Sequence, residues 1–447
     1  MTTVNYRLAG SGETFVTCSL ASLGAPAVPG QEELVARAVN LQISPEDFLF
    51  LQPIVRYLGV SARFKDVLAT FPTPAGRLPE GFRVDTELKA DGLLEIDLVR
   101  DISYGANGEL RPTSLIFSAD SANPYEVEPI APLLGNLTCN PGIVYDLFIN
   151  NPQANVGGRF KTRDEVMIEL GRVLGPGCDI SVELNDPFET DFNKLLEEAA
   201  LFKEILSEYR IVIKVPHTGP VNAANVGQLL EGDKTFDRSY AAPATADAFR
   251  SHQLALKLRE HGYRINYTLM FEPYQTALAL QAKPAFINSF IRHRMMQSGK
   301  IKAFLDAFEA SEDRDHLVGL RTYLLATDYL PRGDSDHDLL DVRRLGRTIV
   351  KYRHYEDEIG ADGLDGVRAN LRWLRQSNLA DTRLIICSME GDLNYPDIDN
   401  LLSSPDYEDM IDRVVLTAEP AYLARFTSTN QVVSYQRRFM NAAATAR

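Results

Sequence analysis

The stretch that decides the fold is RIVIKVPHTGP, residues 210–220, in which Ile and Val alternate around a single lysine. A strand buried on both faces of a parallel sheet has such a nearly continuous run of branched apolar residues. The proline at position 216 favours the end of the strand, because it cannot donate a ladder hydrogen bond. The run therefore predicts a buried parallel strand with Lys214 near its carboxyl end.

Seven more short apolar runs alternate with longer helical stretches from Ser114 onward. This alternation is typical of βαβ units and a parallel sheet, and eight is the strand number of a (β/α)8 barrel. No GxGxxG follows an early strand, so an open dinucleotide-binding sheet is less favoured. We predict an α/β fold, a TIM barrel over residues 111–447. Its strands are SLIFSAD (114–120), LLGNLTCN (133–140), CDISVEL (178–184), RIVIKV (210–215), GYRINYTL (262–269), PAFINSF (284–290), TRLIICS (382–388) and RVVLTAE (413–419).

The rest of the chain lies outside a bare barrel. Residues 1–110 predict a small α+β extension, with amphipathic helical patterns near 31–40 and 46–58 and alternating strands at 82–89 and 93–101. Two connections are too long for single βα units, so we expect insertions near 219–250 and 295–380. The first contains a polar segment at 232–246 that is typical of a lid or a surface loop, and the second contains helical patterns at 339–350 and 365–376.

Composition narrows the class of protein. A net charge of −15 disfavours nucleic acid and anionic membranes as partners, and no apolar run reaches the length of a membrane span. The start of the chain lacks the pattern of a secretory signal, and four scattered cysteines suggest neither disulfides nor zinc. We expect a cytoplasmic protein whose partner is a small molecule, and the sequence leaves a homo-oligomer open.

Lys214 is the first candidate for chemistry. Burial disfavours the ammonium, so we expect a lowered pKa and a neutral amine that attacks carbonyl carbons. The alternatives are a lysine that reaches solvent from the strand end and a buried ion pair.

Other polar residues stand at the ends of the predicted strands: Asp120, Asn140, Glu183, Asn266 and Thr268. In a barrel such side chains point into one cavity at the carboxyl ends of the strands. Each also has a structural alternative, such as a helix cap or an ion pair with a loop. Together they predict the lysine, carboxylates and amides that carbon–carbon cleavage through an imine requires.

These motifs resemble the class I transaldolase family and its fructose-6-phosphate aldolase relatives. The resemblance covers about 114–290 and, more weakly, 382–425. The motifs occur in the family's order and are Asp120-Ser121-Ala122-Asn123, Thr138-Cys139-Asn140-Pro141, Lys214-Val215-Pro216-His217-Thr218 and Asn266-Tyr267-Thr268-Leu269-Met270-Phe271, followed by Gln275-Thr276-Ala277.

The resemblance implies roles for these residues. Lys214 carries the imine, Asp120 moves the proton of the hydroxyl whose C–C bond breaks, and Glu183 with Thr268 activates water. The resemblance also implies that Asn140 and Asn266 hydrogen-bond donor hydroxyls. No metal or other cofactor is implied, because the protonated imine is the electron sink.

The phosphate-binding motifs of the family depart from its pattern here. Asn288 and Ser289 begin the sixth motif, and His293 stands at the position of the family's phosphate-binding arginine, with Arg292 and Arg294 beside it. On the seventh strand, Glu390 replaces an expected cation, and a carboxylate repels phosphate. Either the donor or acceptor lacks a terminal phosphate and carries an amine or a free hydroxyl that Glu390 recognises, or an inserted loop supplies the cation. The candidate substrate-binding residues of these two motifs are Asn288, Ser289, Arg292, Arg294 and Glu390.

The sequence therefore predicts a Schiff-base transaldolase or aldolase that transfers or releases a dihydroxyacetone-type unit, with altered phosphate recognition. The alternatives are a conventional sugar-phosphate transaldolase of the pentose phosphate pathway and a non-catalytic barrel with a binding or regulatory role. The acidic run at 334–338 is expected to be a solvated loop, and His217 is either a loop residue or a substrate contact.

Overall fold

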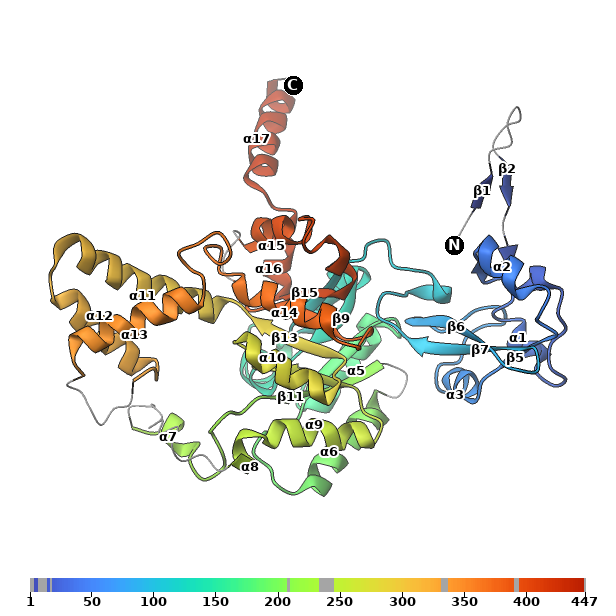
Figure 1. The fold of residues 1–447 in the computed structure, drawn as a ribbon, viewed down its shortest axis with the longest axis horizontal. Helices are drawn as coiled ribbons and strands as arrows, with labels where there is room; N and C mark the ends of the chain where they lie inside the picture. Colours follow the sequence, from blue (N-terminus) through green and yellow to red (C-terminus); the bar gives the residue numbers. More distant parts are fainter. Residues whose placement is uncertain are drawn as a thin grey trace.

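A closed barrel of eight parallel strands forms the centre of the molecule (Figure 1). The computed structural model describes residues 4–6, 14–16, 18–206, 210–232, 245–330, 337–389 and 394–445. Each barrel strand pairs with its neighbours in chain order, and the last pairs with the first. The strands are β8 (Ile116–Asp120), β9 (Leu134–Thr138), β10 (Asp179–Glu183), β11 (Arg210–Pro216), β12 (Ile265–Thr268), β13 (Phe286–Phe290), β14 (Arg383–Cys387) and β15 (Val414–Ala418). One strand falls in each of the eight apolar runs, so the predicted (β/α)8 barrel is confirmed.

Helices cover the outside of the barrel and bury apolar side chains such as Leu170, Phe202 and Leu371 against the strands. They are α4 (Pro124–Val127), α5 (Arg163–Leu174), α6 (Phe192–Ile205), α9 (Arg250–Glu260), α10 (Pro273–Ala279), α14 (Asp365–Gln376), α15 (Asn394–Leu402) and α16 (Pro420–Leu423). Shorter turns of helix are η3 (Glu128–Leu133), η4 (Ile143–Ile149), η5 (Val156–Gly158), η6 (Leu280–Ala282), η7 (Glu408–Arg413) and η8 (Ala424–Phe426).

Three helices after β13 form an arm that projects from the barrel on the left of Figure 1. They are α11 (Arg292–Ser311), α12 (Asp315–Ala326) and α13 (Leu339–Tyr352), and they share an apolar core that includes Leu305, Leu320 and Val342. Helices α13 and α14 lie where the sequence predicts helices. However, α14 packs on α10 and β14, so it covers the barrel rather than extending the arm.

The connection after β11 carries two short helices, α7 (Gly227–Leu230) and α8 (Thr245–Ala248). Most of the lid-like segment at 232–246 lies outside the described residues. A last helix, α17 (Asn430–Thr445), stands away from the barrel at the top of Figure 1. In the described ranges, no helix combines the length and apolarity that crossing a membrane requires.

The N-terminal extension has its own apolar core, built around Phe64, Leu94 and Ile96. Its three-stranded sheet has the order β5 (Tyr57–Val60), β7 (Leu93–Arg100), β6 (Phe82–Leu88), and the two strands predicted at 82–89 and 93–101 form its antiparallel β6–β7 pair. The remaining elements are β1 (Val4–Tyr6), β2 (Thr14–Val16), β3 (Cys18–Ser19), β4 (Gln42–Ile43), η1 (Leu20–Leu23), η2 (Ala106–Gly108), α1 (Glu32–Val35), α2 (Pro45–Leu51) and α3 (Ala62–Thr70).

Both helical predictions in the extension were too long. Helix α2 ends at Leu51 because Pro53 follows, and the chain then enters strand β5. Helix α1 ends at Val35, and the carbonyls of Val39 and Leu41 accept hydrogen bonds from η1 instead of continuing a helix.

The extension closes the floor of the barrel, at the amino ends of the strands. Ile102, 1% exposed, packs against the inward side chains of the barrel strands. Arg210, at the start of β11, donates from Nη1 to the carbonyl oxygen of Gly81 at 2.5 Å. Gly81 has a φ of +73°, and a Cβ atom there would lie 1.6 Å from Nη1 of Arg210. Only glycine fits this contact.

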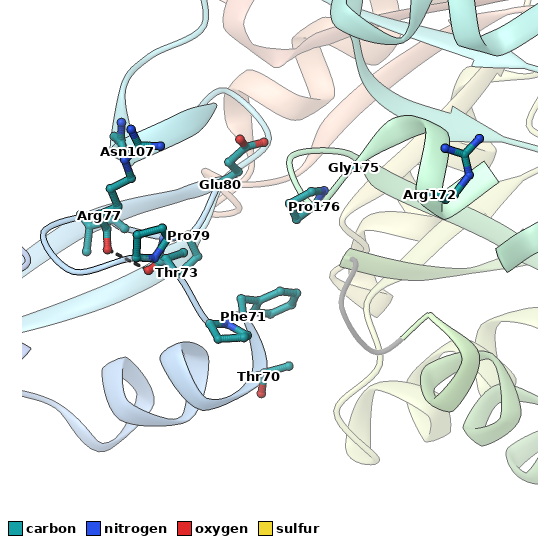
Figure 2. Close-up of a pocket in the computed structure, with 13 residues that line it drawn as sticks. Thr70, Phe71, Thr73, Arg77, Pro79, Glu80, Asn107, Arg172, Gly175 and Pro176 are labelled. Atoms are coloured by element: carbon teal, nitrogen blue, oxygen red, sulfur yellow. Dashed lines mark hydrogen bonds between the residues drawn. The ribbon is translucent and has the colours of Figure 1, made fainter. Parts of the chain in front are cut away.

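Beside this floor, a cavity of about 400 Å³ separates the extension from the barrel (Figure 2). Phe71 and Pro79 line it from the extension, and Gly175 and Pro176 line it from the barrel. The cavity contains none of the site residues that the sequence predicts. Most of the predicted site residues line a different cavity, at the carboxyl ends of the strands.

Candidate active site

A cavity of about 200 Å³ opens among the carboxyl ends of the barrel strands. Seven of the predicted site residues line it: Asp120, Asn140, Glu183, Lys214, Thr268, Asn288 and Arg292. They come from strands β8 to β13 and from the start of α11. The expectation that polar strand ends converge on one cavity around Lys214 is met for Asp120, Asn140, Glu183 and Thr268, but not for Asn266.

Lys214 lies at the base of this cavity and is 4% exposed. Strands β10 and β11 pair with Glu183 directly beside Lys214, which puts Nζ 3.3 Å from Oε2 of Glu183. Nζ also donates to the carbonyl oxygen of Cys139 at 3.2 Å. The sequence left open whether Lys214 reaches solvent or forms a buried ion pair, and the structure shows the buried ion pair.

The expectation of a lowered pKa for Lys214 was wrong. Burial does act to lower the pKa, but the carboxylates of Glu183 and Asp120 outweigh it, and the pKa is raised. The sequence argument considered burial without its partners. In the resting protein Lys214 is thus an ammonium, and it must give up a proton before it can act as a nucleophile.

Asp120 is the second carboxylate near Lys214, at the end of β8. Burial raises its pKa, although Lys214 and a 3.0 Å hydrogen bond from the Thr138 hydroxyl act in the opposite direction. Glu419, which also lines the cavity, adds repulsion and raises the pKa further. A carboxyl with a raised pKa is suited to take up and release a proton.

Thr268 and Asn288 form a hydrogen-bonded pair on neighbouring strands. The Asn288 side-chain amide donates to Oγ1 of Thr268 at 3.0 Å. The Thr268 hydroxyl therefore accepts from one side and keeps its own hydrogen to donate. Asn140 caps the following turn through its Oδ1, which accepts from the backbone of Ile143 at 2.9 Å. Asn140 thus has both of the roles considered for it, a cap and a cavity lining.

Three residues predicted to bind substrate do not line the cavity, and a fourth cannot be placed. Asn266 faces the barrel interior below Thr268, is fully buried and donates to the Ser181 hydroxyl at 3.1 Å. Ser289 accepts a hydrogen bond from Asn370 of α14 at 3.1 Å, on the outer face of the sheet. Glu390 lies outside the described residues.

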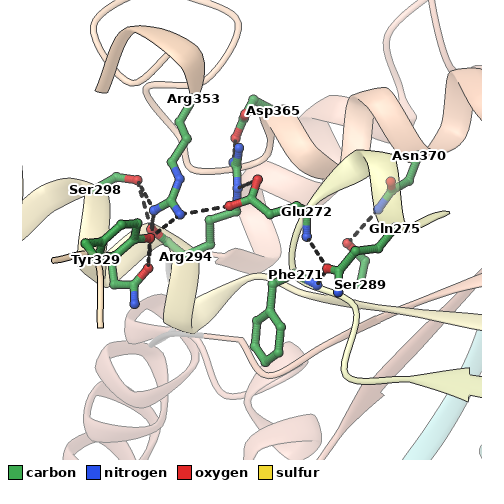
Figure 3. Close-up of polar contacts among 11 residues, drawn as sticks. Phe271, Glu272, Gln275, Ser289, Arg294, Ser298, Tyr329, Arg353, Asp365 and Asn370 are labelled. Carbon is green, nitrogen blue, oxygen red and sulfur yellow. Dashed lines mark hydrogen bonds and ion pairs between the residues drawn. The ribbon is translucent and has the colours of Figure 1, made fainter. Parts of the chain in front are cut away.

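Arg294 is the third predicted substrate-binding residue that does not line the cavity. It belongs to a buried ionic network that joins α10, the arm and α14 (Figure 3). Its Nε lies 3.0 Å from Oε2 of Glu272, and its Nη1 pairs with Asp365. Nη2 of Arg353 lies 2.8 Å from the other oxygen of Glu272. Arg294 fastens the arm to the barrel and does not face the cavity.

Of the three basic residues at 292–294, only Arg292 lines the cavity. Its Nε donates to the carbonyl oxygen of Met389 at 2.6 Å, which holds the guanidinium across the end of β14. His293 instead lies near the Phe271 ring, 5.5 Å between centroids, and near Gln297. Arg292 is thus the residue of this basic run whose position would suit an anionic substrate group.

Sequence reasoning missed several residues that line the cavity: Thr138, Leu269, Phe290, Cys387, Ser388, Met389, Thr417, Ala418, Glu419 and Tyr422. Glu419 is the most consequential, because it adds a third carboxylate. The signal for Glu419 was present, since it ends the eighth apolar run just as Asp120 ends the first. Cys387 is buried, and burial raises the pKa of its thiol.

His217 directly follows β11, and burial lowers its pKa, but it does not line the cavity. In the described ranges, no group of three His, Cys, Asp or Glu side chains could hold a metal ion. Residues 334–336 of the acidic run lie outside those ranges, and Asp338 caps α13.

The fold and the cavity together define a (β/α)8 barrel with a buried lysine–carboxylate pair at the carboxyl ends of its strands. Residues 117–316 match the family model described as transaldolase/fructose-6-phosphate aldolase. This match supports the resemblance that the sequence motifs indicate, and with it an activity of the aldolase or transaldolase type. The matched residues include Lys214, Asp120, Glu183 and Thr268. No curated protein matches the chain significantly.

Proposed function

We propose that this chain is a Schiff-base transaldolase or aldolase that transfers or releases a dihydroxyacetone-type unit on a sugar or sugar-like substrate. The observation that carries the proposal is the 3.3 Å contact between Nζ of Lys214 and Glu183, in a cavity that Asp120 and Thr268 also line. An amine, two carboxylates and a hydroxyl at one point are the groups that imine formation, C–C cleavage and imine hydrolysis need.

The reaction begins when Lys214 transfers a proton to Glu183, its nearest carboxylate. The free amine adds to the ketone carbonyl of the donor, and the carbinolamine loses water as Glu183 and the Thr268 hydroxyl return a proton to the leaving oxygen. The product is a protonated imine, whose positive charge draws electrons from the adjacent carbon–carbon bond.

Asp120 accepts the proton of the hydroxyl on the carbon beyond that bond. The bond breaks, an aldehyde leaves, and the electron pair remains on Lys214 as an enamine. In transfer, the enamine attacks a second aldehyde, which takes back the proton from Asp120. In release, Asp120 returns the proton to the enamine carbon instead. In both cases the product is a protonated imine, which water hydrolyses with Glu183 and Thr268 as its acid and base to free the product and Lys214.

Asn140 and Asn288 are the amides that would hydrogen-bond the hydroxyls of the donor, because both line the cavity. Asn266 was expected to do so as well, but it lies deeper and already donates to Ser181. We therefore propose that Asn266 has a structural role in the barrel interior, below the substrate.

We also propose that phosphate recognition is altered. Three carboxylates, Asp120, Glu183 and Glu419, line the cavity, against two cations, Lys214 and Arg292. A phosphate dianion near Glu419 would be repelled. A substrate end that carries a hydroxyl or an amine is better suited to this cavity.

Arg292 supports a second candidate function, the conventional sugar-phosphate transaldolase. If it binds phosphate, Arg292→Gln raises the KM for fructose 6-phosphate and leaves the KM for fructose unchanged. If Glu419 sets the preference, Glu419→Gln improves the kcat/KM for the phosphorylated donor relative to the free sugar. Glu390→Arg tests whether the carboxylate at that position disfavours phosphate, and the measurement is again the kcat/KM for the phosphorylated donor relative to the free sugar.

The central test is trapping of the imine with borohydride. Incubation with dihydroxyacetone, fructose or fructose 6-phosphate should give a reduced adduct, and peptide mass spectrometry should locate it on Lys214. Lys214→Met should abolish the adduct, whereas Lys351→Met, on exposed α13, should leave it intact. Absence of an adduct with every donor, in protein that is folded by circular dichroism, would favour the non-catalytic barrel instead.

A further inference from the structure

A second polar cavity, of about 590 Å³, lies at the amino ends of β12, β13 and β14, opposite the end that holds Lys214. We call it the basic cavity. Five cationic side chains line it, against the single carboxylate of Asp381: Arg100, Arg259, Arg264, Lys283 and Arg383. The chain as a whole carries a charge of −15, so this concentration of positive charge does not follow from composition.

Two of the five cations are neutralised by acids, one fully buried and one partly buried. Nη1 of Arg264 lies 2.9 Å from Oδ1 of Asp179, and Nη2 of Arg383 lies 2.8 Å from Oδ1 of Asp101. Neither acid is free for another cation, because Asp179 also pairs with Arg210 and Asp101 lies 3.6 Å from Arg83.

The other three, Arg100, Arg259 and Lys283, make no side-chain hydrogen bond or ion pair within the part of the chain that the structure describes. Arg100, at the end of β7, is fixed in place by the rings of Phe71 and Phe82, 5.0 and 5.5 Å from its guanidinium carbon. Ring faces orient a cation but do not neutralise it.

The lowered pKa of Arg100 is consistent with a guanidinium that has no carboxylate paired with it in the described residues. Burial and repulsion from Arg264 lower the pKa of Arg100 to about 9, although Asp179 acts in the opposite direction. Guanidinium groups that leave water are normally paired.

We propose that the basic cavity binds a phosphate-bearing small molecule, at a site separate from the chemistry. Guanidinium and ammonium groups bind phosphate oxygens through charge-assisted hydrogen bonds. The volume is large enough for a phosphate ester rather than a bare ion alone. Because Arg100 comes from the extension and Arg259 and Lys283 from the barrel, the ligand bridges the two. This inference does not depend on the reaction proposed above.

The test is a calorimetric titration with inorganic pyrophosphate at constant ionic strength. The cavity variant is the double substitution Arg259→Gln and Lys283→Gln, and its control is Lys65→Gln with Lys351→Gln, which removes the same charge from exposed helices elsewhere. Wild type and control should bind with equal affinity. The cavity variant should bind at least about tenfold more weakly, the loss expected for removal of a charge-assisted hydrogen bond.

Location is tested by hydrogen exchange. Pyrophosphate should slow the exchange of amides at 93–100 and 378–383 in wild type, and it should do so equally in Lys214→Met. Arg100→Met, checked for folding by circular dichroism, should abolish the effect on 93–100.

Three results would overturn the proposal. The first is the absence of saturable binding to wild type. The second is equal affinity in the cavity variant, which would mean that pyrophosphate binds elsewhere. The third is a change of oligomeric state in the cavity variant, measured by sedimentation, without a change in affinity, which would mean that the cations face another copy of the chain.

Discussion

Substitution of Glu183 by glutamine removes a charge next to Lys214 with almost no change in side-chain volume. The two charged atoms are 3.3 Å apart. At an effective dielectric constant of about 20, unit charges at that distance attract by roughly 5 kcal/mol. Burial acts to lower the pKa of Lys214 and is overcome by Glu183 and Asp120 together. Without the charge of Glu183, the pKa of Lys214 should fall.

Two consequences of Glu183→Gln have opposite signs. More of Lys214 is a free amine at a given pH, so borohydride trapping with dihydroxyacetone should reach its half-maximal rate at a lower pH. Turnover should nevertheless fall by about 10²- to 10⁴-fold, since glutamine cannot exchange protons with the carbinolamine and with water.

The assay measures the trapping rate and the turnover of one protein across a pH series. Glu197→Gln, which removes a charge from an exposed position of α6, serves as the control and should leave both quantities unchanged. A trapping midpoint that stays in place or rises in Glu183→Gln would refute the assignment of Glu183 as the charge that holds the Lys214 proton.

The ion pair of Lys214 and Glu183 also makes the stability of the fold depend on pH. Because the folded pKa of Lys214 is raised above the ordinary value of 10.5, its contribution to stability is complete below that value and is lost as the pH rises through the folded pKa. Unfolding by urea at increasing alkaline pH should therefore reveal a loss of stability in wild type. That loss should be smaller in Glu183→Gln, and an equal loss in both proteins would contradict the linkage.

Three further predictions follow from single contacts. Gly81→Ala should cost several kcal/mol more in urea unfolding than Gly76→Ala, because both have left-handed φ values but only position 81 meets another side chain, and equal costs would remove the steric argument. Arg294→Met should lower the free energy of unfolding by about 3–5 kcal/mol, measured by thermal or urea unfolding, because it leaves buried carboxylates short of a partner. Trapping on Lys214 should persist in that variant, and its loss would mean that Arg294 acts on the substrate. Asp120→Asn should slow C–C cleavage by about 10²- to 10⁴-fold and still allow the borohydride adduct, whereas loss of both would assign Asp120 to imine formation.

The barrel could be predicted because its signal is repeated. Each strand is buried on both faces and is therefore apolar along its length, and the helices between strands have a different period. The extension lacked this redundancy. There Pro53 and the backbone hydrogen bonds of η1 decided where the helices end, and neither effect has a periodic signature.

The site was predicted well where one rule sufficed. Residues at the carboxyl ends of barrel strands face one cavity, and this brought Asp120, Glu183, Lys214 and Thr268 together. The failures have geometric causes. Ser289 follows Asn288 on a strand, so the two side chains must face opposite sides of the sheet.

The prediction for Arg294 was wrong for a similar reason, which here is the geometry of a helix. It lies two residues after Arg292, and two steps of an α-helix turn a side chain by about 200°. Arg292 faces the cavity, so Arg294 faces away from it, toward Glu272 and Asp365. Arg294 joins a network with Glu272 and Arg353, which lie far apart in the chain. No local sequence pattern predicts this network.

The raised pKa of Lys214 disfavours the free amine that acts as the nucleophile, yet it suits the intermediate that follows. The ammonium and the protonated imine carry one positive charge on the same nitrogen, 3.3 Å from the same Glu183 oxygen in the resting protein. A carboxylate that favours the ammonium over the amine therefore also favours the protonated imine over its neutral form, and the protonated imine is the form that withdraws electrons from the breaking bond. The proton that Lys214 must first release moves only as far as Glu183 and returns when water leaves. In the proposed reaction the ion pair thus costs one short proton transfer at the start, and it stabilises the charge on which cleavage depends.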